Sequence, residues 1–230
     1  MDRIQSMRRI EALRDRRFAT SLPSSALESI QSGTLKTRYK GLRLCKNPFD
    51  LVLYLQLIQR LKPQTIIEVG TSEGGSAIWF DDLCTALGLG TRILSFDIAP
   101  PGLESTPTVQ FFEADAGDPE GTFPTEMLKN APHPWLVVDD SAHTYLTVSR
   151  LLRYFDNLVH PGDYVVVEDG IVADLEGLHY EAFDDGPNRA VADFLESRQA
   201  RYRIDSSLCD FYGYNVTYCP NAWLEVCAAS

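Results

Sequence analysis

Short apolar runs alternate with longer amphipathic segments along most of the chain. Runs of β-branched and aromatic residues, typical of buried strands, occupy 65–69, 92–97, 109–115, 135–139 and 164–167. Helical patterns follow at 77–87 and 145–158, and a helix at 48–61 is marked by Asn47 as N-cap and Pro48 at its first position. Because strands and helices alternate, we expect an α/β fold with a mostly parallel sheet and right-handed crossovers.

The C-terminal part departs from this alternation. Residues 171–186 lack a clean period and are long for a loop, which predicts a lid or a substrate wall. A helix is expected at 188–197. Strands are expected at 202–205, 215–219 and 222–226, with a turn at Pro220 and Asn221. An antiparallel pair at the C-terminus would then close the sheet.

The N-terminal part is basic. Ile4, Met7, Ile10 and Leu13 recur every three residues in a segment that carries six arginines between residues 2 and 17, which predicts an amphipathic helix. A frayed basic tail is the alternative. The polar stretch 20–34 predicts a linker. We therefore expect an N-terminal helix and linker at 1–37 and one catalytic domain at 38–230.

Composition narrows the class of protein. The 230 residues, 44% of them hydrophobic, suffice for one sizeable core. A net charge of -11 opposes binding to a phosphate backbone, so no nucleic-acid partner is expected. No apolar run is long enough to span a membrane and the Arg-rich start is unlike a secretory signal, which predicts a cytoplasmic protein with no membrane partner. A basic helix on so acidic a chain predicts a homo-oligomer.

Five cysteines, odd in number and without C-x-x-C spacing, indicate neither a zinc site nor a disulfide framework.

The run 65–76 breaks from apolar residues into glycines and then into a helical pattern, as a strand, tight loop and helix would. Gly70 allows a sharp turn, whereas Gly74 and Gly75 lack a Cβ where a ligand or a neighbouring strand must come close. Such loops line the ligand crevice of open α/β sheets. Ser72 stands where the dinucleotide fingerprint has its second glycine, and the Glu-Val-Gly and Gly-Gly pattern resembles the S-adenosylmethionine (SAM) loop of class I methyltransferases. A purely structural turn is the alternative.

Two acidic residues end the next two predicted strands. Asp97 lies some twenty-odd residues beyond the glycine loop, where a carboxylate binds a ribose diol. SAM and NAD both carry that diol, so Asp97 predicts a nucleoside ligand without choosing between them; its alternative role is a turn or helix cap. Asp115 is positioned to flank an adenine ring.

Carboxylates gather at the ends of the last two parallel strands. Asp139, Asp140 and His143 follow one strand, and Glu168 and Asp169 follow the other. Like charges in one place raise one another's pKa unless a cation offsets them. Oxygen ligands without a cysteine or histidine cluster suit Mg²⁺, with Mn²⁺ or Ca²⁺ as possible substitutes.

We assign Asp140, Glu168 and Asp169 to the metal and place Asp139 nearer to the nucleoside. The alternative is that these acids cap strand ends and pair with Arg150 or Lys129. His143 is either a general base or a structural histidine.

Several motifs together resemble the cephalosporin hydroxylase family. They are the run 41–48, the loop 68–76 with Trp79 and Phe80 behind it, Asp140-Ser141-Ala142-His143, and Gly162-Asp163-Tyr164 leading to Glu168 and Asp169. The resemblance covers residues 38–195 and implies a three-layer, Rossmann-like class I methyltransferase fold that binds SAM and Mg²⁺. It implies the same three metal ligands and a SAM site at Gly70, Ser72, Gly75, Asp97 and Asp139. We also assign Glu68, Thr71, Ser76 and Asp115 to the cofactor site.

The resulting hypothesis is a metal-dependent SAM O-methyltransferase that acts on a hydroxyl of a small natural product or sugar, with Asp140 and His143 in catalytic roles. Two alternatives stay open: a non-catalytic SAM-binding accessory protein of a tailoring oxygenase, and an NAD-dependent dehydrogenase.

Overall fold

The computed structural model describes residues 10–11, 16–177, 181–183 and 186–228. Within them, eight strands form one sheet in the order β1-β9-β10-β8-β7-β4-β5-β6. The strands are β1 (Ile10–Glu11), β4 (Thr65–Val69), β5 (Arg92–Asp97), β6 (Val109–Glu113), β7 (Trp135–Asp139), β8 (Tyr164–Val167), β9 (Tyr202–Asp205) and β10 (Trp223–Val226). Strands β4 to β8 are parallel, whereas β10 is antiparallel to both β8 and β9. The predicted fold class and the closing antiparallel pair are confirmed.

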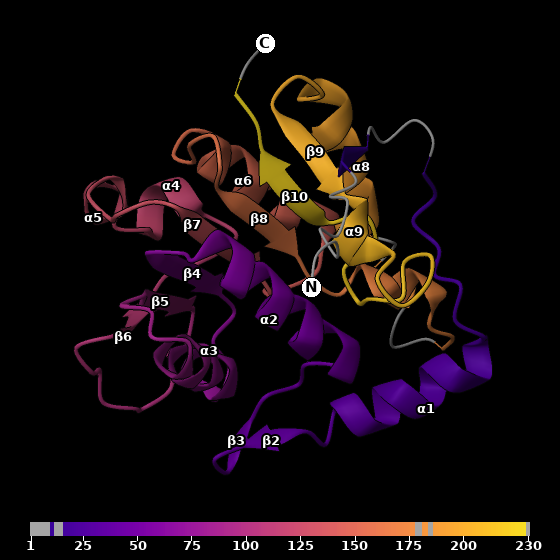
Figure 1. Ribbon diagram of the computed structural model, residues 1–230, viewed down its shortest axis with the longest axis horizontal. Helices are drawn as coiled ribbons and strands as arrows, with labels where there is room; N and C mark the ends of the chain where they lie inside the picture. The colour runs from indigo at the N-terminus through magenta and orange to yellow at the C-terminus, as the bar shows by residue number, and fades with distance from the viewer. Residues whose placement is uncertain (1–9, 12–15, 178–180, 184–185, 229–230) are drawn as a thin grey trace, which may run out of the picture.

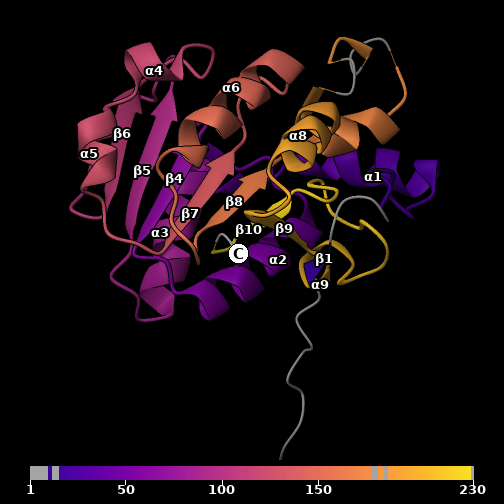
Figure 2. The ribbon, with the colours of Figure 1, turned by 90° about the horizontal axis from the view of Figure 1, so that it is seen from above.

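Helices cover both faces of this sheet (Figures 1 and 2). The helices α2 (Pro48–Leu61) and α3 (Gly75–Ala86) lie on one face, and α6 (Tyr145–Asp156) and α8 (Gly186–Ser197) lie on the other. The shorter elements are α1 (Ser24–Thr34), α4 (Pro119–Thr122), α5 (Thr125–Lys129), the 3-10 helix η2 (Gly170–Asp174), α9 (Ser206–Cys209), and the hairpin of β2 (Arg38–Tyr39) and β3 (Leu42–Arg43). No helix in the described part of the chain has the length and apolarity that a membrane crossing requires.

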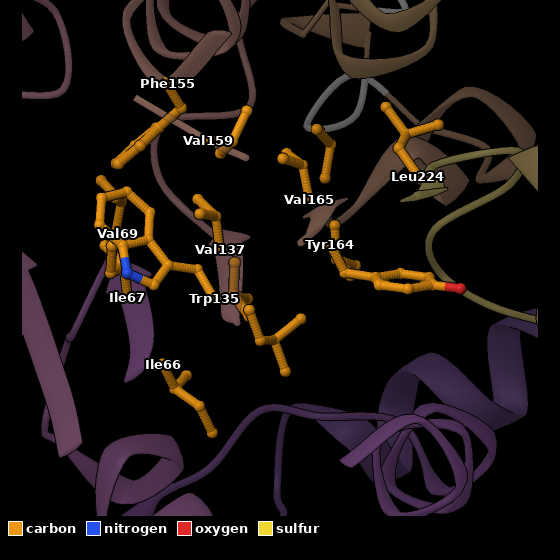
Figure 3. Packing of buried hydrophobic residues seen from close by; sticks show 14 of the residues in the cluster. Ile66, Ile67, Val69, Trp135, Val137, Phe155, Val159, Tyr164, Val165 and Leu224 are labelled. Atoms are coloured by element: carbon orange, nitrogen blue, oxygen red, sulfur yellow. The ribbon is translucent and has the colours of Figure 1, made fainter. Parts of the chain in front are cut away.

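The core lies on both faces of the central strands, which explains their unbroken apolar runs. Every residue of β4 is buried. Ile67 points to the same side as Phe155 of α6 and Val159 just after that helix, whereas Ile66 points to the opposite side, toward α2 and α3 (Figure 3). A strand that alternates between two apolar layers has no solvent face, so it carries no polar alternation.

The predicted start of α2 is confirmed in detail. The Asn47 side chain accepts hydrogen bonds from the backbone N–H groups of Phe49, at 2.9 Å, and Asp50, at 3.1 Å. Pro48 occupies the first turn, where its missing N–H costs nothing. The helix ends at Leu61, and Lys62 adopts a left-handed conformation that closes the last turn onto the Ile58 carbonyl.

The prediction of a linker at 20–34 is wrong, because residues 24–34 form α1. Leu27 is buried against Ile171, Leu175 and Tyr218, with Ile30 packed beside it. Four serines on the exposed turns make the segment look like a polar linker, although its apolar residues recur at helical spacing. The division of the chain at residue 38 stays a prediction.

The prediction of a helix over 2–17 is wrong at Ile10 and Glu11, which form β1 and pair with Ile204 and Asp205. The edge of β9 offers unpaired backbone groups to this segment, and strand pairing satisfies them. Residues 1–9 and 12–15 lie outside the described residues, so the rest of the helix and the homo-oligomer stay predictions. From Arg16 onward the chain is anchored, since the Arg16 guanidinium donates to both Asp210 oxygens, at 2.9 and 2.7 Å.

The predicted strand at 215–219 is also wrong. Both edges of β10, the next strand in sequence, are taken by β8 and β9, so this segment cannot pair with it. It forms turns instead. The Thr217 hydroxyl donates to Asp50 Oδ1 at 2.5 Å, and the Tyr218 N–H donates to Asp50 Oδ2 at 3.0 Å. A buried carboxylate on α2 thus organises the C-terminal segment.

We predict that Gly75→Ala strongly destabilises the fold. A Cβ at Gly75 would lie 2.1 Å from the Arg43 carbonyl oxygen of the β2–β3 hairpin, so backbone would have to move. The expected loss is about 3 kcal/mol or more in the free energy of unfolding, measured by urea denaturation. Gly90→Ala is the matched control, because nothing lies within 4 Å of its Cβ position. Equal stability of the two variants would contradict the close approach.

We predict a pH-dependent stability contribution from Asp50. Burial raises the pKa of Asp50 to about 6, against an ordinary value of 3.8, despite its hydrogen bonds to Thr217, Tyr218 and Asn47. A carboxyl whose pKa is raised by folding stabilises the folded state below the unfolded value, and this contribution is lost as pH rises through about 6. The full change in the free energy of unfolding that this titration produces is roughly 3 kcal/mol.

The measurement is urea unfolding of the parent and of Asp50→Asn between pH 4 and 7. Other buried acids titrate in both proteins, so the difference between the two free energies isolates Asp50. The parent should lose stability relative to the variant as pH rises; a constant difference would contradict the raised pKa.

Candidate active site

A cavity of about 490 Å³ opens at the carboxyl ends of the parallel strands, and its size suits a small organic ligand. Residues that follow β4, β5, β6, β7 and β8 all line it, together with residues from α1 and the segment after it. The lining includes Gly70, Ser72, Phe96, Asp97, Ile98, Ala114, Asp115, Asp140, His143, Asp169, Gln31, Thr34, Leu35 and Cys45. Seven of the predicted site residues therefore share one cavity.

The glycine loop reaches the cavity because Gly70 has no side chain. Its φ is 101°, and a Cβ would lie 2.0 Å from the Asp140 carbonyl oxygen. The close approach brings the ends of β4 and β7 together. Ser72, with φ at 49°, donates its N–H to Asp97 Oδ2 at 2.9 Å, and Ala99 donates to Oδ1 at 2.9 Å. Asp97 therefore fixes the loop and keeps further lone pairs for a ligand.

Asp115 marks the end of the cavity that lies beside β6. Its Oδ1 accepts the Gly117 N–H at 2.7 Å, which shapes the loop after β6. Phe96, Ile98 and Ala114 give this end an apolar surface between two carboxylates. An apolar slot flanked by acceptors is typical of a nucleoside site.

Four predicted cofactor residues lie behind the loop rather than on the cavity. Glu68, Thr71 and Ser76 are buried, and the open side of Gly75 faces the β2–β3 hairpin. Ser95 joins this group: its hydroxyl donates to Glu68 Oε2 at 2.5 Å and lies 2.7 Å from the Thr71 hydroxyl. Burial raises the pKa of Glu68. These side chains support the loop, and a direct contact with a cofactor stays a prediction.

Asp139 is buried at the end of β7 and is not on the cavity wall either. Its Oδ1 accepts the Ser141 hydroxyl at 2.6 Å and the Ser141 N–H at 3.2 Å, while Oδ2 has no hydrogen-bond partner among the described residues. Burial raises the pKa of Asp139. Its predicted cofactor contact stays a prediction.

Asp140, His143 and Asp169 converge on the cavity. One ligand atom of each lies within 4.8 Å of the others, a spacing that admits a shared metal ion. His143 Nε2 is 3.4 Å from Asp169 Oδ2 and 3.9 Å from Asp140 Oδ1. Burial raises the pKa of Asp169, partly opposed by His143. Phe183, from the segment predicted as a lid or wall, packs its ring edge-on at 5.8 Å from the His143 ring. Residues 178–180 and 184–185 lie outside the described residues, so the lid stays a prediction.

Glu168 has a different environment from the other predicted metal ligands. Its Oε1 accepts the Tyr54 hydroxyl at 2.5 Å, and its Oε2 accepts the Lys46 ammonium at 2.7 Å. Lys46 also donates to Asp140 Oδ2 at 2.6 Å. The structure therefore gives both Glu168 oxygens a protein donor, and its role as a metal ligand stays a prediction.

Sequence reasoning missed the role of Lys46, although the residue lies within the run 41–48 that carried the resemblance. Its side chain is 1% exposed. Burial lowers the pKa of Lys46, but the charges of Asp140, Glu168 and Glu68 outweigh this effect and hold the pKa well above its ordinary value. Burial and the Asp140 charge raise the pKa of Glu168, opposed by Lys46. A signal was available, because a lysine directly before a helix cap is unfavourable unless anions lie nearby.

The alternative in which Arg150 or Lys129 neutralises these acids is wrong. The Arg150 guanidinium donates to the Gly117 carbonyl, and Lys129 pairs with Glu126 at 2.7 Å. The far wall of the cavity, formed by Gln31, Thr34 and Leu35, was also missed, because its helix looked like a linker.

Comparison with known proteins identifies the class of this site. The Rhamnosyl O-methyltransferase/CmcI family model matches residues 32–227. The chain belongs to this family.

The Rhamnosyl O-methyltransferase of Mycobacterium tuberculosis is 29% identical over 82% of this chain and 78% of its own length. The Rhamnosyl O-methyltransferase of Mycobacterium leprae is 28% identical over 82% of this chain and 82% of its own length. The solved structure of CmcI with Mg and SAM has a TM-score of 0.67 at 22% identity, over 84% of this chain and 78% of CmcI. This member of the family is thus a SAM-dependent O-methyltransferase by class.

We predict that Lys46→Met destabilises the protein by about 3–5 kcal/mol, because Glu168 would be left charged and buried without its cation. The double variant Lys46→Met/Glu168→Gln should recover much of this loss, since it also removes the more deeply buried carboxylate and leaves only Asp140, whose side chain is 20% exposed, without its cation. The measurement is urea denaturation at pH 7. If the double variant is no more stable than the single one, the ion pair is not what holds this site together.

Proposed function

We propose that this protein transfers the methyl group of SAM to a hydroxyl of a small polyhydroxylated molecule, most directly a sugar, with a divalent cation at the acceptor oxygen. The observation that carries the proposal is one cavity that joins a nucleoside-type end, at Asp97 and Asp115, to a carboxylate and imidazole cluster at Asp140, His143 and Asp169. The names of the mycobacterial relatives support a sugar acceptor.

The nucleoside end is built to hold SAM in one orientation. Asp97 has lone pairs left for two ribose hydroxyls after its two backbone bonds. Gly70 lines the cavity and packs directly against the Asp140 backbone, so a SAM whose nucleoside lies at Asp97 and Asp115 would place its sulfonium end beside the β4 loop and next to the acidic cluster. Negative charge there favours a sulfonium, and holding it in place lowers the entropic cost of methyl transfer.

The donor set fits a hard divalent cation. Asp140 Oδ1 and Asp169 Oδ2 both face the cavity at the spacing that one ion requires. Such a cation supplies Lewis acidity, which lowers the pKa of an acceptor hydroxyl. Two assignments compete for the third ligand: Glu168, which must first give up Lys46, and His143, which already faces both aspartates.

In the assignment with Glu168 as third ligand, His143 Nε2 is free of the cation and is the proposed proton acceptor for the acceptor hydroxyl. Its Nε2 lies on the cavity wall, 3.9 Å from Asp140 Oδ1 and 3.4 Å from Asp169 Oδ2, where it can reach the proton of a bound hydroxyl. The methyl group moves from sulfur to the acceptor oxygen, S-adenosylhomocysteine (SAH) leaves, and the hydroxyl proton passes to His143.

Calorimetric titration with SAM, SAH and NAD, followed by a methyl-transfer assay on methyl α-L-rhamnopyranoside with Mg²⁺, tests the proposal. SAM and SAH binding without NAD binding, and EDTA-sensitive transfer, are expected. Binding of SAM with no transfer to any hydroxylated acceptor would favour the accessory-protein alternative. Binding of NAD alone would favour the dehydrogenase.

We predict that Asp169→Asn lowers turnover by about a hundredfold or more, the scale expected for losing a preorganised charge at the reacting centre. The affinity for SAH should change by less than about threefold, because β7 and β4 lie between the end of β8, which carries Asp169, and the strands β5 and β6 that form the nucleoside end. Glu126→Gln is the control, a similar loss of one acidic charge at an exposed ion pair. Full activity of Asp169→Asn in EDTA-treated buffer would end the cation proposal.

The same assay resolves the third ligand. Titration of Mg²⁺ into Glu168→Gln and His143→Gln, each loaded with SAH, shows which substitution weakens cation binding. A variant that binds Mg²⁺ like the parent has not lost a ligand.

A further inference from the structure

The cavity has a second end, for which the nucleoside site does not account. The sheet order places the end of β6 at one side of the cavity and the end of β8 toward the other. Figures 1 and 2 both show α1 on the side of the molecule away from β6. Gln31, Thr34 and Leu35 of this region line the cavity, so α1 forms the wall beyond the catalytic cluster.

Two polar atoms on this wall lack partners. Thr34 is 3% exposed, and its hydroxyl has no hydrogen-bond partner within the described residues; the same holds for the buried Oε1 of Gln31. Other hydroxyls of this region behave differently. The Ser29 hydroxyl donates to the Ser25 carbonyl at 3.0 Å, and the Thr37 hydroxyl donates to the Gly33 carbonyl at 3.1 Å.

An unpaired buried polar atom costs about 1–3 kcal/mol, and a ligand in the cavity that pairs with it would recover this cost. Residues three apart on a helix share a face, with Cβ atoms about 5–6 Å apart. Gln31 and Thr34 can therefore reach neighbouring groups of one ligand. An amide oxygen accepts hydrogen bonds, and a hydroxyl both donates and accepts, which together suit adjacent hydroxyls of a sugar ring.

We propose that Gln31 and Thr34 form the acceptor subsite, where they bind ring hydroxyls next to the one that is methylated. This inference rests on the proposed function and specifies its acceptor as a polyhydroxylated ring.

The test compares Thr34→Val, Thr34→Ser and Gln31→Ala with the parent, using methyl α-L-rhamnopyranoside as the probe. Thr34→Val keeps the shape but removes the hydroxyl, so the KM for the probe should rise about 3- to 10-fold, as for the loss of one hydrogen bond. The SAH affinity and the kcat should stay near the parent values. Thr34→Ser keeps the hydroxyl and should restore the KM. Ser29→Ala, on the exposed side of α1, is the control and should leave every value unchanged.

Thermal unfolding separates a binding role from a structural one. Because the Thr34 hydroxyl has no protein partner, Thr34→Val should have a Tm equal to or above that of the parent. An unchanged KM in both Thr34→Val and Gln31→Ala would overturn the subsite. An increase in KM that comes with a lower Tm and weaker SAH binding would also overturn it, in favour of a structural role.

Binding of the probe to the SAH-loaded protein, followed by NMR titration, needs no turnover. A parent that binds the probe without methylating it would contradict the proposed function, while weaker binding by Thr34→Val would still support the subsite. A parent that methylates the probe, with Thr34→Val binding it equally well, would contradict the subsite alone. No binding of the probe to the parent would overturn the subsite as a site for a sugar ring.

Discussion

One buried ammonium group holds the site together. Lys46 lies between Asp140, at the end of β7, and Glu168, at the end of β8, and Tyr54 of α2 donates to the same glutamate. A charge this deeply buried is stable only because two carboxylates offset the loss of water. The pairing ties the segment before α2 to two central strands and sets the position of the acidic cluster. Without it, the like charges of that cluster would repel one another.

The segment that contains Lys46 also fixes the position of the C-terminal part of the chain. Asn47 caps α2 and donates to Asp50, and Asp50 accepts from Thr217 and Tyr218. Tyr218 in turn packs with Leu27 of α1. A chain of buried contacts, polar as far as Tyr218 and apolar between Tyr218 and Leu27, therefore joins the catalytic cluster to the helix that forms the far wall of the cavity. Each contact depends on the next, since a buried carboxylate that loses one donor bears its full desolvation cost.

Sequence patterns predicted the central layer well because burial on two faces leaves a strong signal. The apolar runs of β4, β7 and β8, and the Asn47 cap, depend only on neighbours in sequence. The errors arose where distant segments decide the outcome. Ile10 and Glu11 form a strand because β9 has a free edge, whereas residues 215–219 form none because both edges of β10 are paired. The helix α1 forms because its few apolar residues pack against η2. Lys46 was overlooked because its two partners are 94 and 122 residues away.

The two ends of the cavity differ in physical origin, and the difference bears on how such a protein changes its substrate. The nucleoside end is shaped by backbone: Gly70 must meet the Asp140 carbonyl, and Ser72 and Ala99 N–H groups fix Asp97. Substitution there disturbs the ends of the sheet itself. The far end is shaped by side chains of a surface helix, whose residues contribute little to the main core. A change at Gln31 or Thr34 can therefore alter which hydroxyl faces His143 while the cofactor, the acidic cluster and the fold stay as they are.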